Sequence, residues 1–113
     1  MIARAEAKYI RIAPLKVRRV IDLVRGKGLN EAFAILTNIQ RRAGLPVKKL
    51  LDSALSNAKQ KVREITPEQL VISHIEANGG PMLKRHRAGS MGRAMPILKR
   101  TTHIQVSLEK GRR

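Results

Sequence analysis

The spacing of hydrophobic and polar positions changes several times along the chain, and each spacing predicts one element. Residues 3–12 alternate small or aromatic side chains with long charged ones, which predicts a half-buried strand, with a helix as the alternative because alanine is frequent. Pro14 suits the first turn of a helix, and apolar residues at i, i+3, i+4 and i+7 from Val17 give that helix one buried face. Gly26 or Gly28 is expected to end it.

Two more helices are predicted in the middle of the chain. The first has Asn30 as its expected N-cap and an apolar stripe behind it, and a polar, basic link at residues 40–44 ends it. The second, the longest, begins at Pro46 and keeps apolar residues on one face as far as Val62. Residues 66–68 are expected to form a loop.

The last part of the chain predicts a long β-hairpin. Residues 70–75 are apolar and favour a strand, and residues 102–108 alternate apolar and polar at the period of a strand. Between them lies a basic arm, residues 81–100, whose small, glycine-bearing middle at residues 88–92 is typical of a turn. Each side of the arm has roughly ten residues and would span roughly 30 Å. An isolated two-stranded ribbon is only marginally stable in water, so the arm should need a partner.

This order of elements predicts an α+β fold: a three-stranded antiparallel sheet packed against three helices, with a long protruding β-hairpin. The first strand is expected to pair with a hairpin strand, because the sequence offers no other sheet edge. A chain of 113 residues suffices for one modest core. We therefore expect a single domain over residues 1–113, with residues 1–80 and 100–110 as the globular body and roughly residues 81–99 as the extended basic arm.

The charge balance is strongly basic. Lysine and arginine number 24 against 8 acidic residues, a formal net charge of +16, and no acidic residue occurs between Glu76 and Glu109. Such an excess repels itself unless a polyanion neutralises it, which makes nucleic acid the leading partner and an anionic membrane the main alternative. Gly89, Gly92 and Pro96 obstruct the amphipathic helix that a membrane-binding arm would need. A solvated charge run would usually lack the flanking strands, so nucleic acid is favoured.

Several kinds of chemistry are excluded or disfavoured. The chain has no cysteine, which excludes disulfides, thiolate zinc sites and cysteine nucleophiles. The three histidines, His74, His86 and His103, are scattered, and the carboxylates fall on different predicted elements, where surface ion pairs explain them better than acid–base catalysis. No segment approaches the ~20 apolar residues of a membrane span, and the N-terminus lacks a signal-peptide core. We expect an intracellular, cytoplasmic protein without enzymatic activity, cofactor or metal.

The kind of nucleic acid is indicated by the scarcity of aromatic residues. The chain has one tyrosine, Tyr9, one phenylalanine, Phe33, and no tryptophan. A surface that stacks several single-stranded bases is therefore disfavoured. The helix from Pro46 shows no clear face for reading DNA bases. Recognition of structured RNA by shape and phosphate contact, through arginine and lysine, is the remaining interpretation.

Three blocks of the sequence, taken together, resemble one known family. They are AKYIRIAP with KVR and DLVRGK in residues 7–27, VKKLL with SA and NA in residues 47–58, and GP, LKR, GRA and ILKRTTHI in residues 80–104. In this order they are similar to the bacterial large-subunit ribosomal protein family numbered twenty-two, over nearly the whole chain.

The resemblance implies a structural protein of the large ribosomal subunit, near the exit of the peptide tunnel. Its hairpin would run inward between segments of 23S ribosomal RNA, contact several RNA domains during assembly and line part of the tunnel. Neighbouring large-subunit proteins and the nascent peptide near the hairpin tip would be further partners. Carried over by position, the expected RNA contacts are Arg11, Lys16, Arg18, Lys84, Arg85, Arg87, Arg93, Lys99, Arg100, Thr101 and His103, and the tunnel-facing tip is Ala88, Gly89, Ser90, Met91 and Gly92.

The sequence departs from the family pattern in two places. Gly89 stands where the family usually has a cationic residue, which puts a charged contact between tip and nascent chain in doubt. Ala13 replaces a frequent serine at the start of the first helix, which should weaken the helix cap by about 1 kcal/mol. The alternative function, from a different class, is a free-standing regulator or chaperone that binds structured RNA.

Overall fold

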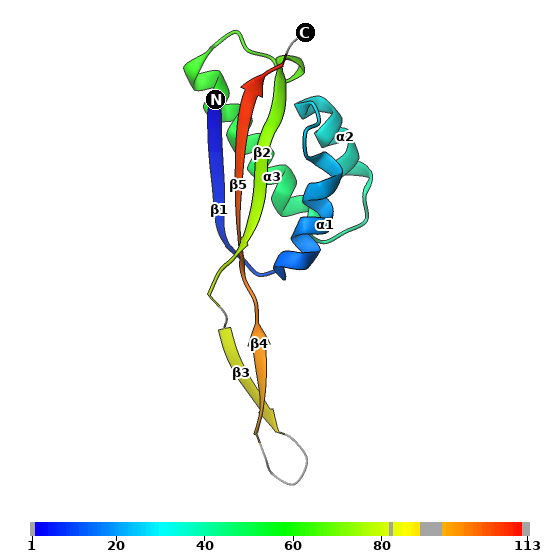
Figure 1. The fold of residues 1–113 in the computed structure, drawn as a ribbon, viewed down its shortest axis with the longest axis vertical. Helices are drawn as coiled ribbons and strands as arrows, with labels where there is room; N and C mark the ends of the chain where they lie inside the picture. Colours follow the sequence, from blue (N-terminus) through cyan, green and yellow to red (C-terminus); the bar gives the residue numbers. More distant parts are fainter. Residues whose placement is uncertain (1, 82, 89–93, 112–113) are drawn as a thin grey trace.

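The elements follow the predicted order (Figure 1). The structure, a computed structural model, describes residues 2–81, 83–88 and 94–111, and of residues 83–88 and 94–99 it describes the backbone. The predicted tip at Gly89, Ser90, Met91 and Gly92 therefore lies outside the described residues. The elements are β1 (Ala3–Ile10), α1 (Pro14–Val24), α2 (Leu29–Asn38), α3 (Gly44–Lys61), the 3₁₀ turn η1 (Pro67–Gln69), β2 (Leu70–Gly79), β3 (Leu83–Ala88), β4 (Ala94–Lys99) and β5 (Thr102–Lys110).

The main sheet has three antiparallel strands in the order β1-β5-β2. The first strand thus pairs with a strand of the hairpin, as predicted. The predicted alternation in β5 is confirmed, because Ile104, Val106 and Leu108 are buried while the residues between them are half-buried. Beyond the body, β3 and β4 form a separate two-stranded ladder, which Figure 1 shows projecting from the end of the sheet.

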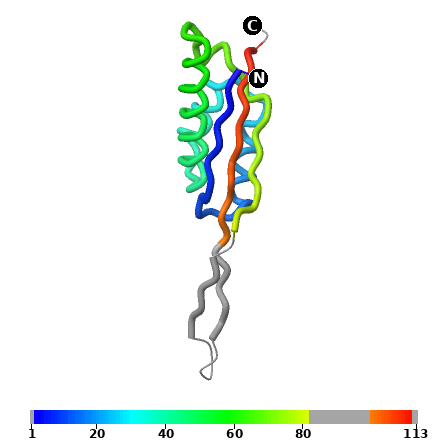
Figure 2. The backbone as a smooth tube through the Cα atoms, turned by 90° about the vertical axis from the view of Figure 1, so that its left-hand side faces the viewer, coloured from blue at the N-terminus to red at the C-terminus, as the bar shows by residue number. Residues whose placement is uncertain are grey.

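The helices cover one face of the main sheet and enclose the core. Helix α3 packs on β1 and β5, α1 packs along β2, and α2 lies against both helices. Figure 2 shows α3 running alongside the strands of the body. Burying one Val, Leu or Ile side chain contributes about 1.5–3 kcal/mol, so this layer is the main source of stability. The core includes Val17, Val20, Ile21 and Val24 of α1, Val47, Leu50 and Leu51 of α3, and Leu70, Ile72, Ile75, Ile104, Val106 and Leu108 of the sheet. The predicted α+β class is confirmed.

The outer edge of β2 is occupied by α1 and the segment that follows it. Arg18 Nε donates a hydrogen bond to the Ala77 carbonyl at 3.1 Å, and Arg25 Nη2 donates to the Ile75 carbonyl at 3.1 Å. The Ile72 N–H donates to the Lys27 carbonyl at 3.0 Å. An edge strand whose polar groups are already bonded is a poor template for pairing with another chain.

Several predicted helix boundaries are wrong by a few residues. Helix α2 has Gly28, not Asn30, at its N-cap, because Gly28 forms a β-bridge with Val71 and the fully buried Leu29 already belongs to the helix. Val62 was predicted on the buried face of the longest helix, but it lies just beyond the helix end and is 44% exposed.

Two further predicted boundaries also differ. Helix α3 begins at Gly44 rather than Pro46, with Ala43 as its N-cap, because the Val47 N–H already donates to the Ala43 carbonyl at 3.4 Å. The predicted loop at residues 66–68 overlaps the 3₁₀ turn Pro67–Gln69, and the N–H of its N-cap residue, Thr66, donates to Gln69 Oε1 at 3.2 Å. Gly26, by contrast, follows α1 with a left-handed φ of 76°, as expected of a helix stop.

The start of α1 has no side-chain cap. Ala13 is the N-cap residue, with φ −60° and ψ 140°, and makes no side-chain hydrogen bond. A serine hydroxyl at this extended position could accept a hydrogen bond from an N–H of the first turn. We expect Ala13→Ser to raise the free energy of unfolding by about 1 kcal/mol, measured by urea denaturation. Ala13→Val adds bulk without an acceptor; equal stabilisation by both variants would contradict the capping explanation.

Candidate nucleic-acid interface

The base of the arm is tied to the body by two threonines. The Gly80 N–H donates to the Thr101 carbonyl at 2.9 Å, and Thr101 Oγ1 donates to the Pro81 carbonyl at 2.6 Å. Thr102 Oγ1 donates to the carbonyl of Ile12, in the segment between β1 and α1, at 2.5 Å. Both threonines are buried. The position at which the arm leaves the body is therefore fixed by internal hydrogen bonds.

A basic cleft of about 840 Å³ opens at the same end of the body. The six cationic residues in its lining come from the segment between β1 and α1, from α1, from the link between α2 and α3, and from the residue before Thr101. Within the described part of the chain, no carboxylate lines it. We call this site the basic cleft; its lining consists of Arg11, Ile12, Ala13, Lys16, Arg19, Arg41, Arg42, Ala43 and Arg100.

Buried neighbours hold the cations of the basic cleft in place. Arg11 precedes the buried Ile12, and Arg42 precedes the buried Ala43. Arg100 in turn precedes the buried Thr101. In each pair the buried residue fixes the backbone while the exposed arginine next to it extends into solvent. Lys16 and Arg19 are three residues apart on α1, a spacing that places them on the same side of a helix, off its buried face.

The electrostatics of the basic cleft favour an anion. Like charges in one hollow repel one another unless counterions or a ligand neutralise them. Three carboxylates of the described residues contact basic side chains away from the cleft: Asp22 contacts Arg25 at 3.1 Å, Glu31 contacts Lys27 at 4.0 Å, and Glu76 contacts His74 at 3.4 Å. Arginine presents a planar fork of N–H donors that matches the oxygens of a phosphate. The cleft is therefore suited to bind several phosphates at once.

The residues predicted as RNA contacts do not all come together. Arg11, Lys16 and Arg100 meet in the basic cleft. Arg18 instead reaches β2, where its Nε is bonded to the Ala77 carbonyl. Thr101 is buried, and its hydroxyl is bonded inside the protein. Of the remaining predicted contacts, His103 lies on the sheet face away from the helices. Lys84, Arg85 and Arg87 belong to β3 and Lys99 belongs to β4, where the structure describes the backbone. Arg93 lies outside the described residues.

Three cations of the basic cleft were not predicted as contacts. Arg19 was recognised only as part of a basic N-terminal region, and Arg41 and Arg42 only as part of a polar link. The available signal was two adjacent arginines in a connection without acidic residues. Nothing in the local pattern shows that this connection folds against the start of α1, because that placement depends on how α2 and α3 pack.

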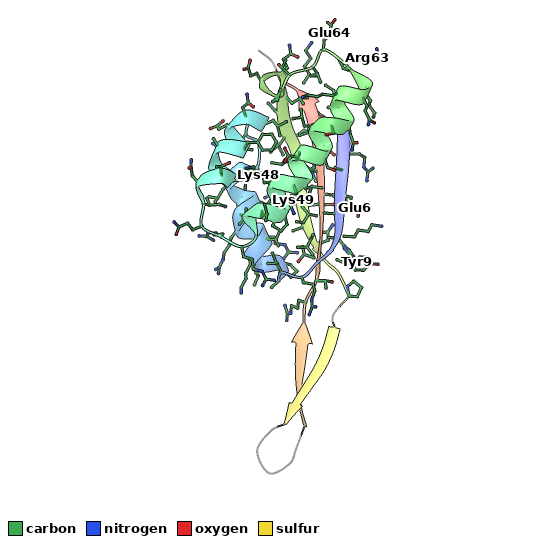
Figure 3. All side chains as sticks on the ribbon, turned by 180° about the vertical axis from the view of Figure 1, so that it is seen from behind. Glu6, Tyr9, Lys48, Lys49, Arg63 and Glu64 are labelled. Carbon is green, nitrogen blue, oxygen red and sulfur yellow. The ribbon has the colours of Figure 1, made fainter. Side chains whose placement is uncertain are left out.

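Different residues lie at the two ends of the body. Figure 3 shows Tyr9 at the end where the arm begins, and Arg63 and Glu64 at the opposite end, beyond α3. The α+β body, the projecting hairpin and the basic cleft at the hairpin's base define a class of protein built around contact with a polyanion.

Comparison with known proteins narrows this class. Residues 5–109 match the family model described as "Ribosomal protein L22p/L17e". The chain is 44% identical over 110 residues to the "Large ribosomal subunit protein uL22" of Clostridium tetani, covering 97% of this chain and 98% of that protein. It is also 44% identical over 106 residues to the protein of the same name in Halothermothrix orenii, covering 94% and 93%. The chain belongs to the ribosomal protein L22p/L17e family.

Family membership settles the general role. The chain is a structural, non-enzymatic constituent of the large ribosomal subunit in the cytoplasm, a component of the translation machinery whose partners are ribosomal RNA and other ribosomal proteins. The resemblance seen in the three sequence blocks is confirmed. Among the described residues, no helix is long and apolar enough to cross a membrane, and no cluster of His, Cys, Asp or Glu could hold a metal ion.

Proposed function

We propose that the chain binds folded 23S ribosomal RNA through the basic cleft and continues this contact along its arm toward the peptide exit tunnel. The single observation that carries the proposal is the convergence of six cations from distant parts of the sequence at the base of the arm. Because only the folded body brings residues 11–19, 41–42 and 100 together, binding at the cleft depends on the tertiary fold.

The cleft is suited to a bend in an RNA backbone rather than to a base sequence. Contacts from arginine and lysine to phosphates position a protein on RNA and release counterions, which makes the affinity depend steeply on salt. An irregular fold of RNA brings together the phosphates of nucleotides that are far apart in the RNA sequence. Cations facing one hollow from several directions match such a cluster better than they match a straight helix.

The arm extends this surface in the proposal. Its cationic residues lie in a ladder of only two strands, which is marginal alone and gains order from RNA on its sides. In this scheme residues 1–80 and 100–110 anchor the protein, and residues 81–99 reach inward across several RNA domains. With Gly89 at the tip in place of a cation, the tip would contact the nascent peptide by shape rather than by charge. The arm contacts proposed are Lys84, Arg85, Arg87, Arg93 and Lys99.

Three further residues complete the proposed RNA surface in different ways. Arg18 would contact RNA with the guanidinium N–H groups other than Nε, which serves Ala77. Thr101 would act indirectly, since its hydroxyl holds the arm to the body at Pro81. His103 lies half-buried on the open sheet face and would contact RNA beside Tyr9.

Sedimentation of cell extracts tests the proposed function. A tagged copy of the chain, expressed in a bacterium that lacks its own copy, should migrate with the large subunit in moderate salt. It should remain there after subunits are separated from polysomes. A pool at the top of the gradient that is bound to varied transcripts would instead indicate a free-standing regulator or chaperone, and would contradict the proposal.

A further inference from the structure

Tyr9 has an unusual backbone for a bulky residue. Its φ is 60°, and among the non-glycine residues that the structure describes it is the one with a positive φ. It falls where the pairing of β1 with β5 is irregular, between Ala7 and Ile10. Left-handed backbone is unfavourable for an aromatic residue, and such outliers persist where the surroundings enforce them, often at functional positions.

His103 of β5 contacts both the backbone and the ring of Tyr9 in this conformation. The Tyr9 N–H donates to His103 Nδ1 at 3.1 Å, and the two rings meet edge to face with centroids 4.9 Å apart and an interplanar angle of 89°. In an edge-to-face pair at most one face of either ring is covered by the other. Tyr9 therefore keeps at least one ring face clear of His103, and the residue is 62% exposed.

The pair lies at the base of the arm with cations on both sides of Tyr9 in the sequence, while Glu6 and Glu76 lie further along the sheet, paired with Gln105. Lys8 and Arg11 are exposed on either side in the sequence, and Arg11 lines the basic cleft. A Cβ atom added at Gly80 would lie 3.1 Å from His103 Cε1 and Nε2, so the imidazole packs closely against the start of the arm. Figure 3 shows Tyr9 at this end of the body.

We propose that the Tyr9–His103 pair is a stacking site for one unpaired base of the RNA whose phosphates occupy the basic cleft. The inference rests on the proposed function. An exposed aromatic face, fixed by a second ring and flanked by cations, is the chemistry that binds a nucleobase without reading its sequence. The scarcity of aromatic residues disfavours a platform for many bases, but one stacked base requires only one such ring.

Two substitutions of Tyr9 separate stacking from folding. Asparagine tolerates left-handed backbone, so Tyr9→Asn removes the ring while keeping the conformation, and Tyr9→Phe keeps the ring. Binding to transcribed 23S ribosomal RNA should be about 10-fold weaker for Tyr9→Asn and within about twofold of the native chain for Tyr9→Phe. The salt dependence should be unchanged in both, because no charge is removed. Heparin, a polyanion without bases, should bind all three proteins equally.

Ultraviolet crosslinking adds a direct readout of the contact. Irradiated complexes of the native chain with the same RNA should yield a peptide in which Tyr9 carries a nucleotide, identified by mass spectrometry. Equal RNA affinities for the native chain and Tyr9→Asn, without that adduct, would overturn the stacking site while leaving salt-dependent RNA binding intact. Equal weakening toward RNA and heparin would also overturn it. Absence of salt-dependent RNA binding by the native chain would contradict the proposed function itself.

Discussion

Replacing Arg41, Arg42 and Arg100 together with alanine is expected to weaken binding to 23S ribosomal RNA by about 100-fold in moderate salt. The three side chains face one cleft from two distant segments, and each would hold a phosphate through charge-assisted hydrogen bonds. The slope of log affinity against log salt should become shallower by roughly 2 to 3, because fewer counterions are released. Filter binding at several salt concentrations measures both quantities.

The opposite end of the body supplies a matched control. Lys59, Lys61 and Arg63 are exposed at and beyond the end of α3, and replacing all three with alanine removes the same net charge. If the cleft is the phosphate site, this control should shift the affinity only a few-fold, as expected of long-range charge alone. Equal losses in the two triple variants would mean that net charge, and not the cleft, determines binding.

Gly80→Ala is expected to have the largest effect on the folded state, lowering the free energy of unfolding by about 2 kcal/mol. The added Cβ would lie 2.5 Å from Thr101 Oγ1 and 3.1 Å from the imidazole of His103. Thr101 cannot easily turn away, since it is buried and its hydroxyl is bonded to the Pro81 carbonyl. The variant should therefore distort the junction from which the arm leaves the body and reduce incorporation into large subunits.

The preceding glycine is the control for this prediction. A Cβ added at Gly79 would meet nothing within 4 Å, and its φ is not in the left-handed range. Gly79→Ala should therefore change the free energy of unfolding by less than about 0.5 kcal/mol. Urea denaturation gives the stabilities, and quantitative mass spectrometry of purified subunits gives the incorporation. Indistinguishable results for the two alanine variants would show that the junction is not sterically restricted.

Much of the fold follows from local sequence patterns, because burial imposes a period on each element. The alternation at residues 102–108 gives the central strand, and the apolar stripe from Val17 gives the buried face of α1. The boundaries were less predictable. Gly28 replaces Asn30 as a cap because of its bridge to Val71, a contact between residues far apart in the chain.

The candidate site was only partly predictable, for the same reason. The sequence identifies the cations Arg11, Lys16 and Arg100 as contacts, but they fall in two basic segments that are separated by a less charged middle part of the chain. The structure folds that middle back, so that Arg41 and Arg42 join the same cleft. The irregularity that exposes Tyr9 depends equally on tertiary contacts, since the His103 ring that supports it comes from the other end of the chain.

The hydrogen bonds along the edge of β2 show that composition alone does not identify the arginines that can contact RNA. Arg18 was predicted only as an RNA contact, yet its Nε is bonded to a carbonyl of β2, as is Nη2 of Arg25. A basic residue in a strongly basic protein can thus serve the fold as well as a ligand. Which arginines are available to RNA becomes visible only when their hydrogen bonds are known.

Directed hydroxyl-radical probing tests most directly whether RNA lies in the basic cleft. The chain has no cysteine, so a single introduced cysteine is a unique attachment point for an iron chelate. Leu15, 64% exposed beside the cleft residue Lys16, and Val62, 44% exposed at the end of α3, provide tethers at the two ends of the body. In reconstituted large subunits, Leu15→Cys should cut 23S ribosomal RNA strongly at a few neighbouring nucleotides, and Val62→Cys only weakly. Strong cleavage from Val62→Cys together with none from Leu15→Cys would contradict RNA binding in the cleft.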